Sequence, residues 1–328
     1  MSRPSPEMSV VIVTPDSYET IRKTVQHLRA QTVNDRLEIV IVAPSAAQLA
    51  LDDPAIGDSL QVRVVAVGEI RTIAGAYAAG IREARAPVVV LSEDHSFPEP
   101  GWAEALIDAH RQPWAIVGPV VRNANPDNLI SWADFLLGYG AWLDPAPGGE
   151  IDHLPGHNSS YKRAILLDCD RELEAMLEAE CLLHWDLRAK GHRLYLEPRA
   201  RTAHLNFARL GPWIPYLVHA ARVFAAARAR RWSPLRRLLY AGAAPLIPVV
   251  RLWRIRSELR RPGRPSDLWP RVIPALIVGL TLDAVGQALG YALGAGQAGR
   301  KLSYFEFHRD RYPARRRPPH GTDVISAP

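Results

Sequence analysis

An apolar stretch of the sequence runs directly into residues that could bind a metal ion. Residues 88–91 are Val, Val, Val and Leu, and the next four are Ser92, Glu93, Asp94 and His95. Carboxylate oxygens are the ligands that Mg²⁺ and Mn²⁺ prefer, and a rigid strand end can hold such an ion against a diphosphate. The same residues could instead form a turn and cap before a helix expected from residue 101. These residues alone leave both interpretations open.

Short apolar runs predict the strands that would position these side chains. Four of them cover residues 9–14, 37–44, 62–68 and 86–92. They are almost continuously apolar, which is typical of strands buried on both faces. A helix with Ile21, Val25 and Leu28 on one face follows the first strand, and the alanine-rich segment 72–85 predicts a helix close to the sheet. This alternation predicts a doubly wound, mostly parallel α/β sheet, in which ligands bind beyond the carboxyl ends of the strands.

The pattern continues to about residue 206. We expect a helix near 101–111, a strand at 115–121, and one helix over 171–191 that ends at Gly191. Residues 192–206 are expected to form an edge-like strand pair interrupted by Pro198.

Charge divides the chain of 328 residues into two unlike parts. Residues 1–198 contain 17 Lys and Arg against 28 Asp and Glu, whereas residues 199–328 contain 23 against 6. The acidic part, with two cysteines in the whole chain and no recognisable secretion signal, is expected in the cytoplasm. The basic part is expected to meet an anionic surface, either a membrane or a nucleic acid.

Composition favours a membrane as that surface. Residues 238–250 are apolar, residues 251–265 form an Arg-rich connector, and residues 272–296 contain Asp283 as their only charge. The last segment could cross a bilayer or form a buried helix. Flanking arginines, Trp253 and Trp269 are typical of a membrane interface, and no nucleic-acid module is recognisable, so no nucleic-acid partner is expected. We therefore expect three parts: a catalytic domain at 1–212, a helical membrane-associated region at 213–300 and a disordered Pro/Arg-rich tail at 301–328.

The order of these blocks resembles a known family. From "SVVIVT" through "APVVVLSEDHSFPEPGW" to "GHNSSYKRAIL" and "EAECLLHWDLRAKGHRLYLEPRARTAHLN", the sequence is similar to the inverting glycosyltransferases of family 2, which have the GT-A fold. The resemblance ends near residue 206. It implies a nucleotide-sugar donor, a divalent metal ion (Mg²⁺ or Mn²⁺), and a hydroxyl acceptor that attacks the sugar in one inverting displacement.

The resemblance also implies a metal and donor site. The family's Asp-x-Asp motif falls on Ser92, Glu93 and Asp94, so the first aspartate is missing here. Asp94 is then the expected metal ligand, Glu93 or His95 would supply the lost ligand, and His204 matches a histidine that can approach the metal. Thr14, Asp16 and Ser92 match positions near the donor, and Arg71 could pair with its diphosphate or be a surface charge.

The acceptor side is implied in the same way. The family carries its general base in an acidic pair thirteen residues before a glycine, which falls on Ala179 and Glu180. Glu180 is the expected base and Glu178 the alternative. Because residues two apart on a helix point in different directions, at most one would face the cleft. Gly156 and Asn158 are expected to shape the acceptor-side loop.

Departures from the family pattern leave a second hypothesis open. Ala43, Pro44 and Ser45 replace the usual Asp-Asp-Gly-Ser after the second strand, so recognition of the donor base by an acid there is not expected. The main hypothesis is a glycosyltransferase at the cytoplasmic face of the cell membrane, acting on a lipid-linked or membrane-proximal glycan. The alternative is a non-catalytic GT-A-like protein that binds nucleotide or glycan, or that serves as a membrane scaffold.

Overall fold

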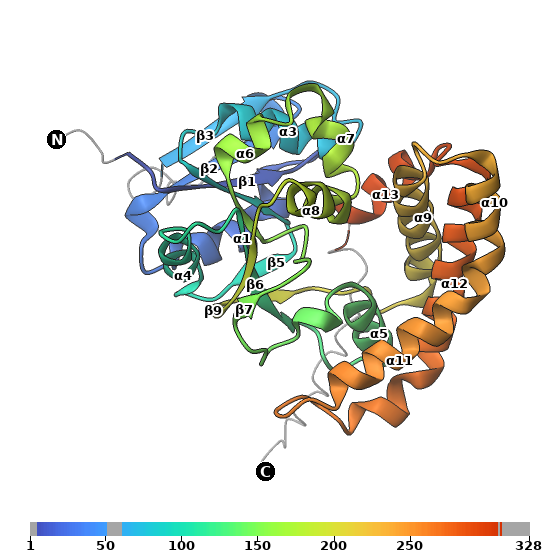
Figure 1. Cartoon of the computed structure of the whole chain (residues 1–328). Coiled ribbons are helices and arrows are strands. Elements are labelled where there is room, and N and C mark those ends of the chain that lie inside the picture. Colours follow the sequence, from blue (N-terminus) through green and yellow to red (C-terminus); the bar gives the residue numbers. More distant parts are fainter. Residues whose placement is uncertain (1–4, 51–60, 308, 310–328) are drawn as a thin grey trace, which may run out of the picture.

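The computed structural model describes residues 5–50, 61–307 and 309 (Figure 1). The strands are β1 (Met8–Val13), β2 (Leu37–Ala43), β3 (Gln61–Ala66), β4 (Val88–Ser92), β5 (Ser96–Pro98), β6 (Ile116–Asn123), β7 (Gly149–Glu150), β8 (Ser160–Lys162) and β9 (Leu194–His204). The helices are α1 (Tyr18–Arg29), α2 (Ala46–Leu49), α3 (Ile73–Glu83), α4 (Trp102–Ala109), α5 (Leu129–Gly138), α6 (Arg163–Leu167), α7 (Leu173–Leu177), α8 (Glu180–Ala189), α9 (Leu210–Arg228), α10 (Pro234–Ala243), α11 (Ile247–Leu259), α12 (Leu268–Leu293) and α13 (Ala298–Phe307).

The strands form one mixed, mostly parallel sheet. Their order is β3-β2-β1-β4-β8-β6-β9-β5, and β7 pairs with β9 outside this path. The β3-β2-β1-β4 half is parallel, as is the β6-β9 pair, while β5, β7 and β8 run antiparallel to their neighbours. The predicted doubly wound, mostly parallel α/β architecture is confirmed.

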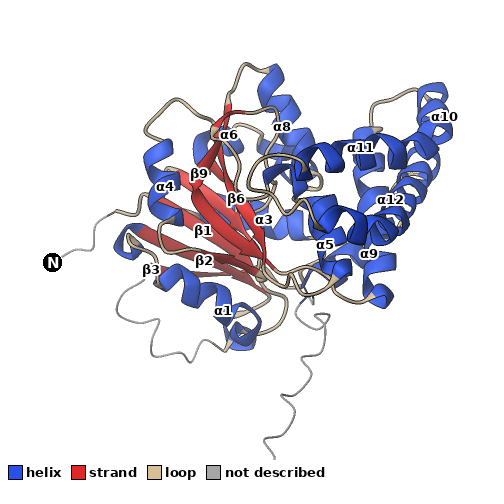
Figure 2. Ribbon diagram, turned by 90° about the horizontal axis from the view of Figure 1, so that it is seen from below, coloured by secondary structure: helices blue, strands red, loops and turns tan. Residues whose placement is uncertain are grey.

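Apolar side chains on both faces of the sheet hold its helices. Every residue of β1, β2 and β4 is buried, as their continuous apolar runs predict. In β1, Val10 and Ile12 join the core formed with α1 and α4, whereas Val11 and Val13 join the core formed with α3, α6, α7 and α8. Figure 2 shows helices on the two sides of the red strands. Burying each such side chain contributes about 1.5–3 kcal/mol.

The alanine-rich helix α3 packs very close to the sheet, as expected. A Cβ atom added to Gly80 would lie 2.4 Å from Cγ1 of Val11 and 2.9 Å from Cγ2 of Val42. Only glycine fits between α3 and these strands, so the small residues of this segment fix the distance between helix and sheet.

Two predictions about the segment 171–206 are wrong. The helix expected over 171–191 is broken between α7 and α8, where Ala179 has an extended φ of −149°. The strand pair expected at 192–206 is the single strand β9, which lies inside the sheet between β6 and β5. Pro198 is accommodated by an irregularity in which the β6-β9 register shifts between Pro119 and Val120.

The C-terminal helices pack together beside the sheet domain. α12 contacts α9, α10, α11 and α5, and α13 packs on α9. α9 begins at Leu210, so the boundary expected at 212 falls inside a helix. The connector expected at 251–265 is largely the helix α11. Residues 301–307 belong to α13, which corrects the tail expected at 301–328; residues 308 and 310–328 lie outside the described residues.

Candidate active site

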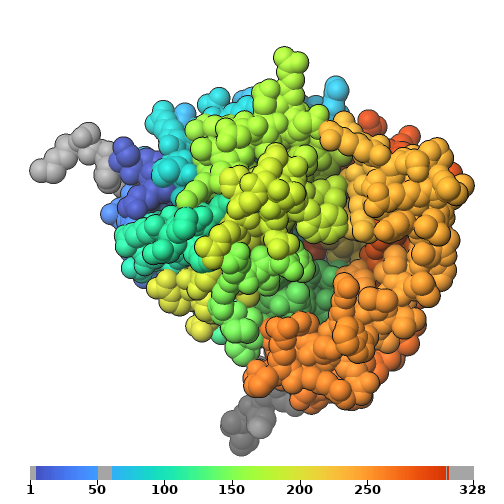
Figure 3. Space-filling view, in the orientation of Figure 1, coloured from blue at the N-terminus to red at the C-terminus, as the bar shows by residue number. Residues whose placement is uncertain are grey.

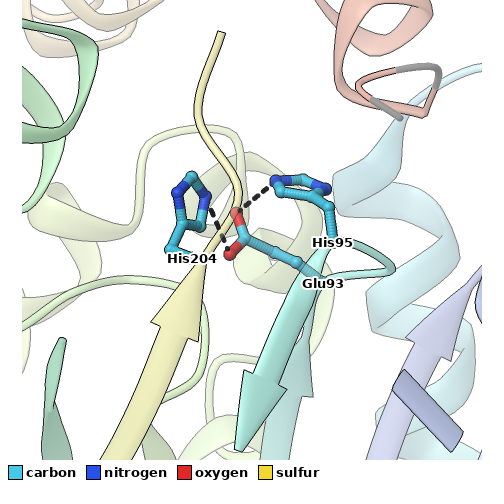
Figure 4. Close-up of side chains that lie close together, drawn as sticks. All are labelled: Glu93, His95 and His204. Carbon is cyan, nitrogen blue, oxygen red and sulfur yellow. Dashed lines mark ion pairs between the residues drawn. The ribbon is translucent and has the colours of Figure 1, made fainter. Parts of the chain in front are cut away.

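Two neighbouring strands bring Glu93, His95 and His204 together beyond the sheet. Glu93 and His95 follow β4, and the antiparallel β5-β9 pairing places Ser96 opposite His204. One carboxylate oxygen of Glu93 lies 3.6 Å from Nε2 of His95, and the other lies 3.5 Å from Nε2 of His204. Figure 4 shows the Glu93 carboxylate between the two imidazole rings. All three side chains are buried, and their nearest atoms lie within 4.8 Å of one another.

The orientation of both histidine rings suits metal binding. Nδ1 of His204 lies 2.8 Å from Oδ1 of Asn206, and Nδ1 of His95 lies 2.5 Å from Oδ1 of Asp94. Each Nδ1–H therefore donates to an oxygen, and Nε2 of each ring faces the Glu93 carboxylate. Both Nε2 atoms are buried without a hydrogen-bond partner among the described residues. Burial, assisted by Arg309, lowers the pKa of His95 well below its usual value and keeps that ring neutral.

The Glu93 carboxylate is the centre of a hydrogen-bond network. The Tyr139 hydroxyl donates to it at 3.0 Å, the Asn158 side-chain amide at 2.8 Å, and Nδ1 of His157 at 2.9 Å. Burial opposes ionisation of Glu93, but His204 and His157 outweigh it and hold its pKa well below the usual value. Glu93 is thus a fixed anion among histidines.

His157 connects this centre to Glu180. Its Nε2 lies 2.8 Å from Oε1 of Glu180, while its Nδ1 contacts Glu93. Burial disfavours the imidazolium, yet Glu180 and Glu93 together raise the pKa of His157 well above its usual value. Burial likewise opposes ionisation of Glu180, but His157 lowers the pKa of Glu180. Glu180 is therefore held as a carboxylate at neutral pH.

Local backbone structure positions Glu180. The break at Ala179 makes Glu180 the first residue of α8. The N-terminus of a helix favours a negatively charged side chain such as this one. A Cβ atom on Gly156 would lie 2.5 Å from the Cβ of Glu180, so the loop can approach only with glycine there. Asn158 has a φ of 62°, a left-handed conformation that asparagine tolerates better than most residues. Both loop residues expected on the acceptor side thus support the acidic side chains.

The alternative base Glu178 lies outside this network. It is the residue after α7 and is exposed, and burial together with Glu174 raises its pKa. Glu178 and Glu180 both line the large cavity, so the expectation that at most one of them faces the cleft is wrong. The reason is the break between α7 and α8, because of which the two residues do not share one helix.

The expected donor residues are dispersed. Thr14 is buried at the end of β1 and accepts a hydrogen bond from the backbone N–H of Asp16. Arg71 is exposed, pairs with Glu69 at 3.3 Å and lines the rim of the large cavity. The Ser92 carbonyl accepts a hydrogen bond of 2.9 Å from the Tyr77 hydroxyl. Of these three residues, Ser92 lines a small pocket together with Glu93 and His95.

A cavity of about 1670 Å³ opens from this centre toward the C-terminal helices. Its lining includes Glu93, His157, Glu180 and His204 at one end and Leu246, Val250 and Trp253 of α10–α11 and their connection at the other. Figure 3 shows the surface hollowed between the green and yellow sheet-bearing part and the orange helices. The site is therefore shared between the sheet domain and the helical region.

Several site residues were missed by sequence reasoning. His157 stands between the two predicted loop residues Gly156 and Asn158, and this position in the sequence could have identified it as a site residue. Tyr139, Glu306 and Arg309 also line the cavity, but they lie in segments with no pattern that marks them.

Comparisons with known proteins agree with this fold. Residues 9–169 match the family described as Glycosyl transferase family 2. Mannosyltransferase PcManGT from Pyrobaculum calidifontis, solved with GDP-Man and Mn²⁺, superposes with a TM-score of 0.54 at 15% identity, over 87% of each chain. GalNAc-T7, solved with UDP, GalNAc and Mn²⁺, has a TM-score of 0.49 at 14% identity, over 62% of this chain and 44% of that longer one. The fold is that of a GT-A glycosyltransferase.

A curated relative extends the comparison. Glucosyl-dolichyl phosphate glucuronosyltransferase from Haloferax volcanii is 27% identical over 227 residues, which cover 61% of this chain and 70% of the relative. Residues 9–169 and this relative therefore give the chain its similarity to glycosyltransferase family 2.

Proposed function

We propose that the chain is a metal-dependent, inverting glycosyltransferase that moves a sugar from a nucleoside-diphosphate donor to the hydroxyl of a lipid-linked acceptor at a membrane surface. One observation carries the proposal: the metal-binding group and the ionised Glu180 face one cavity and are joined through His157. A metal beside the leaving group and a base beside the acceptor are the two groups that this displacement requires.

Glu93, His95 and His204 would hold the metal ion. Their buried, unpartnered Nε2 atoms and fixed carboxylate fit a divalent cation, and two imidazoles favour Mn²⁺ over Mg²⁺. Asp94, the ligand expected first, is outside this group of three; it orients His95 through Nδ1. When bound, the ion would neutralise the diphosphate leaving group.

Glu180 would remove the acceptor proton. Its lowered pKa keeps it ionised, and the contact with His157 fixes the orientation of its carboxylate. The contact to His157 uses Oε1, so the second carboxylate oxygen would accept the proton of an acceptor hydroxyl in the cavity. The hydroxyl would then attack the anomeric carbon opposite the leaving group, which inverts its configuration.

The acceptor class is inferred from the other end of the cavity. The lining continues from Glu180 to apolar residues that are also exposed on the molecular surface, among them Leu246 at 64% and Trp253 at 68% exposure. Such a passage suits a substrate whose reactive hydroxyl or phosphate is attached to a lipid. The name of the archaeal relative, which refers to a dolichyl phosphate, supports the same class.

The helices α10 and α11 would rest on the membrane. The segments Pro234–Leu259 and Leu268–Leu293 are long and apolar enough to span a bilayer, but only 11% of the first is buried, against 39% of the second. Residues 234–257 contain no Asp or Glu, and Arg236 and Arg254 are exposed among the apolar side chains. Exposed leucine, valine and tryptophan with arginine are typical of a helix that lies in the interface plane of an anionic membrane. The cytoplasmic leaflet is such a surface.

A donor screen tests the proposed activity. UDP- and GDP-sugars would be incubated with the purified chain and Mn²⁺, and nucleoside diphosphate release would be measured with and without a polyprenyl phosphate or its glycosylated form. We expect turnover with one donor class, and Glu180→Gln should reduce it at least about 100-fold. Glu178→Gln is the matched control, because it removes the same charge two residues away, and it should retain activity.

Two results would contradict the proposal. Binding of a nucleotide sugar without turnover in any combination would favour the non-catalytic GT-A-like protein. Equal loss in the two glutamate variants would remove Glu180 from its role as the base.

A further inference from the structure

The last described helix returns the chain to the metal-binding centre. Oε2 of Glu306, near the end of α13, lies 3.9 Å from Nε2 of His95. Glu306 and Phe307 also line a small pocket of about 20 Å³ together with Glu93, Asp94 and His95. Figure 1 shows α13, in red, beside α9 on the side that faces the sheet domain. The C-terminal helical region therefore contributes side chains to a site that begins at β4.

Arg309 is a buried guanidinium in this region. Its side chain is 3% exposed, and its Nη2 lies 2.7 Å from Oε2 of Glu306. Its Nη1 lies 3.5 Å from Oδ2 of Asp134, which is a long contact. Asp134 already accepts hydrogen bonds from the backbone N–H of Phe207 at 3.0 Å and from the indole of Trp213 at 2.9 Å. Glu306 is thus the only close ionic partner of Arg309 among the described residues.

The guanidinium retains donors for another ligand. Its Nε is buried and has no hydrogen-bond partner in the part of the chain that the structure describes. The guanidinium carbon lies 4.5 Å from the ring centre of Phe207 and 4.8 Å from that of Tyr216, so the rings restrain the side chain by cation–π contact. Arg309 lines the same large cavity as Glu93 and His204. A restrained guanidinium with an unused donor is suited to bidentate binding of phosphate oxygens.

We propose that Arg309 is a phosphate-binding residue of the donor site, delivered by the C-terminal helix, and that Glu306 holds its guanidinium in place until the diphosphate arrives. This inference rests on the proposed use of a nucleoside-diphosphate donor. The diphosphate is then bound from two sides, by the metal ion on Glu93, His95 and His204 and by Arg309. Because Glu306 and the diphosphate compete for the same guanidinium, removing the charge of Glu306 should strengthen diphosphate binding.

Calorimetric titration of the full chain tests this assignment. UDP and GDP would be titrated in the presence of Mn²⁺, and Mn²⁺ would be titrated alone. In Arg309→Gln we expect the affinity for the nucleoside diphosphate to fall about 10- to 100-fold, while the Mn²⁺ affinity stays within about twofold of the wild-type value. Lys301→Gln is the matched control, because it removes the same charge from an exposed position of the same helix that does not line the cavity.

The variant Glu306→Gln separates the two roles that this glutamate could have. We expect it to bind the nucleoside diphosphate several-fold more tightly, with unchanged Mn²⁺ affinity. A loss of Mn²⁺ affinity would make Glu306 a metal ligand instead of a competitor, and would overturn its assigned role.

The remaining outcomes are also decisive. If the wild-type chain binds neither UDP nor GDP with Mn²⁺, the proposed donor class fails and this inference fails with it. If the wild-type chain binds one of them and Arg309→Gln binds it equally well, only the assignment of Arg309 is wrong. Should Arg309→Gln not fold in a thermal unfolding scan, Arg309→Lys decides: retained fold with about tenfold weaker diphosphate binding supports the loss of bidentate contact, and unchanged binding overturns it.

Discussion

Nε2 of His157 lies 2.8 Å from Oε1 of Glu180, and this contact joins the two halves of the candidate active site. The other nitrogen of the same ring lies 2.9 Å from Oε1 of Glu93, so one imidazole contacts both the candidate metal-binding centre and the candidate base. Neither glutamate can move without changing its contact with this ring. His157 is therefore a positioning residue of the proposed site.

Replacing His157 should impair turnover more than donor binding. In His157→Phe, Glu180 loses its one ionic partner among the described residues, and we expect kcat to fall about 10- to 100-fold with a smaller change in the donor KM. His157→Gln keeps one donor and should retain more activity. Steady-state kinetics with the donor found in the screen checks this. An equal rise in KM with unchanged kcat would place His157 in donor binding instead.

Gly156→Ala should displace Glu180 without affecting the metal. The added methyl group would meet Cβ, Cγ and Cδ of Glu180 within 2.7 Å, so the glutamate must shift. We expect a loss of kcat of at least about tenfold, with Mn²⁺ affinity unchanged. The control is Gly211→Ala, because a methyl group there meets no atom within 4 Å. Wild-type kcat in Gly156→Ala would show that this close approach does not matter for turnover.

Metal binding should depend strongly on the two histidines and less strongly on the residues that orient them. His95→Ala and His204→Ala each remove an Nε2 that faces Glu93, and we expect Mn²⁺ binding to become undetectable by calorimetry. Asp94→Asn and Asn206→Ala change the acceptors of the Nδ1 protons without removing either Nε2, and should weaken Mn²⁺ binding about 10- to 100-fold. The reverse order, with Asp94→Asn the most severe, would make Asp94 the direct ligand.

Stability should fall between neutral and mildly acidic pH. Burial lowers the pKa of His110 and of His184 from 6.5 to about 4. Between these values the unfolded chain binds protons that the folded chain does not, so the free energy of unfolding falls as the pH falls from 6.5 toward 4. The stabilising contribution of the two neutral histidines is fully present above pH 6.5. Each histidine contributes on the order of 3 kcal/mol over this window. Urea unfolding at pH 7 and pH 5 measures the loss.

The variant His184→Gln identifies one source of that loss. Glutamine can keep hydrogen bonds in place of those to the Leu154 N–H and the Tyr161 hydroxyl, but it does not titrate. The difference in unfolding free energy between the two pH values should therefore shrink. An unchanged difference would assign the pH dependence to other groups.

Membrane binding should depend on the exposed side of α10–α11. Leu246→Ser combined with Trp253→Ser removes two large exposed apolar groups, and we expect the chain to lose most of its flotation with vesicles that contain phosphatidylserine. Leu210→Ser, at the exposed start of α9, is the control and should float like the wild type. Flotation of the double variant that resists high salt would indicate insertion through another segment.

The sheet could be predicted because its signals are local, whereas the completed site could not. Continuous apolar runs identify β1, β2 and β4 without knowledge of their partners. The break before Glu180 has no such signal, since Leu177 and Leu183 continue the helical pattern across it. The contact between Glu180 and His157 comes from tertiary packing, which overrides the local preference for a continuous helix.

Composition also led to a wrong prediction for the C-terminal part. Arg-rich sequence at 251–265 indicated a connector, but Ile255 and Leu259 are buried and turn it into the helix α11. Arg309 stands at the edge of a Pro/Arg-rich tail, where one arginine cannot be distinguished from the others. Its burial beside Glu306 is visible only in three dimensions.

The return of α13 to the sheet domain has a consequence for how this protein is made. During synthesis, the strands from β1 to β9 leave the ribosome roughly a hundred residues before Glu306 does. The candidate metal-binding histidines can therefore assemble while Glu306 and Arg309 are still missing from the candidate site. A prematurely terminated chain that stops after β9 would carry the sheet and the histidines but not the residues that α13 brings back to them. Translation to the end of α13 is thus required to complete the candidate site, and we expect truncated products to have no glycosyl-transfer activity.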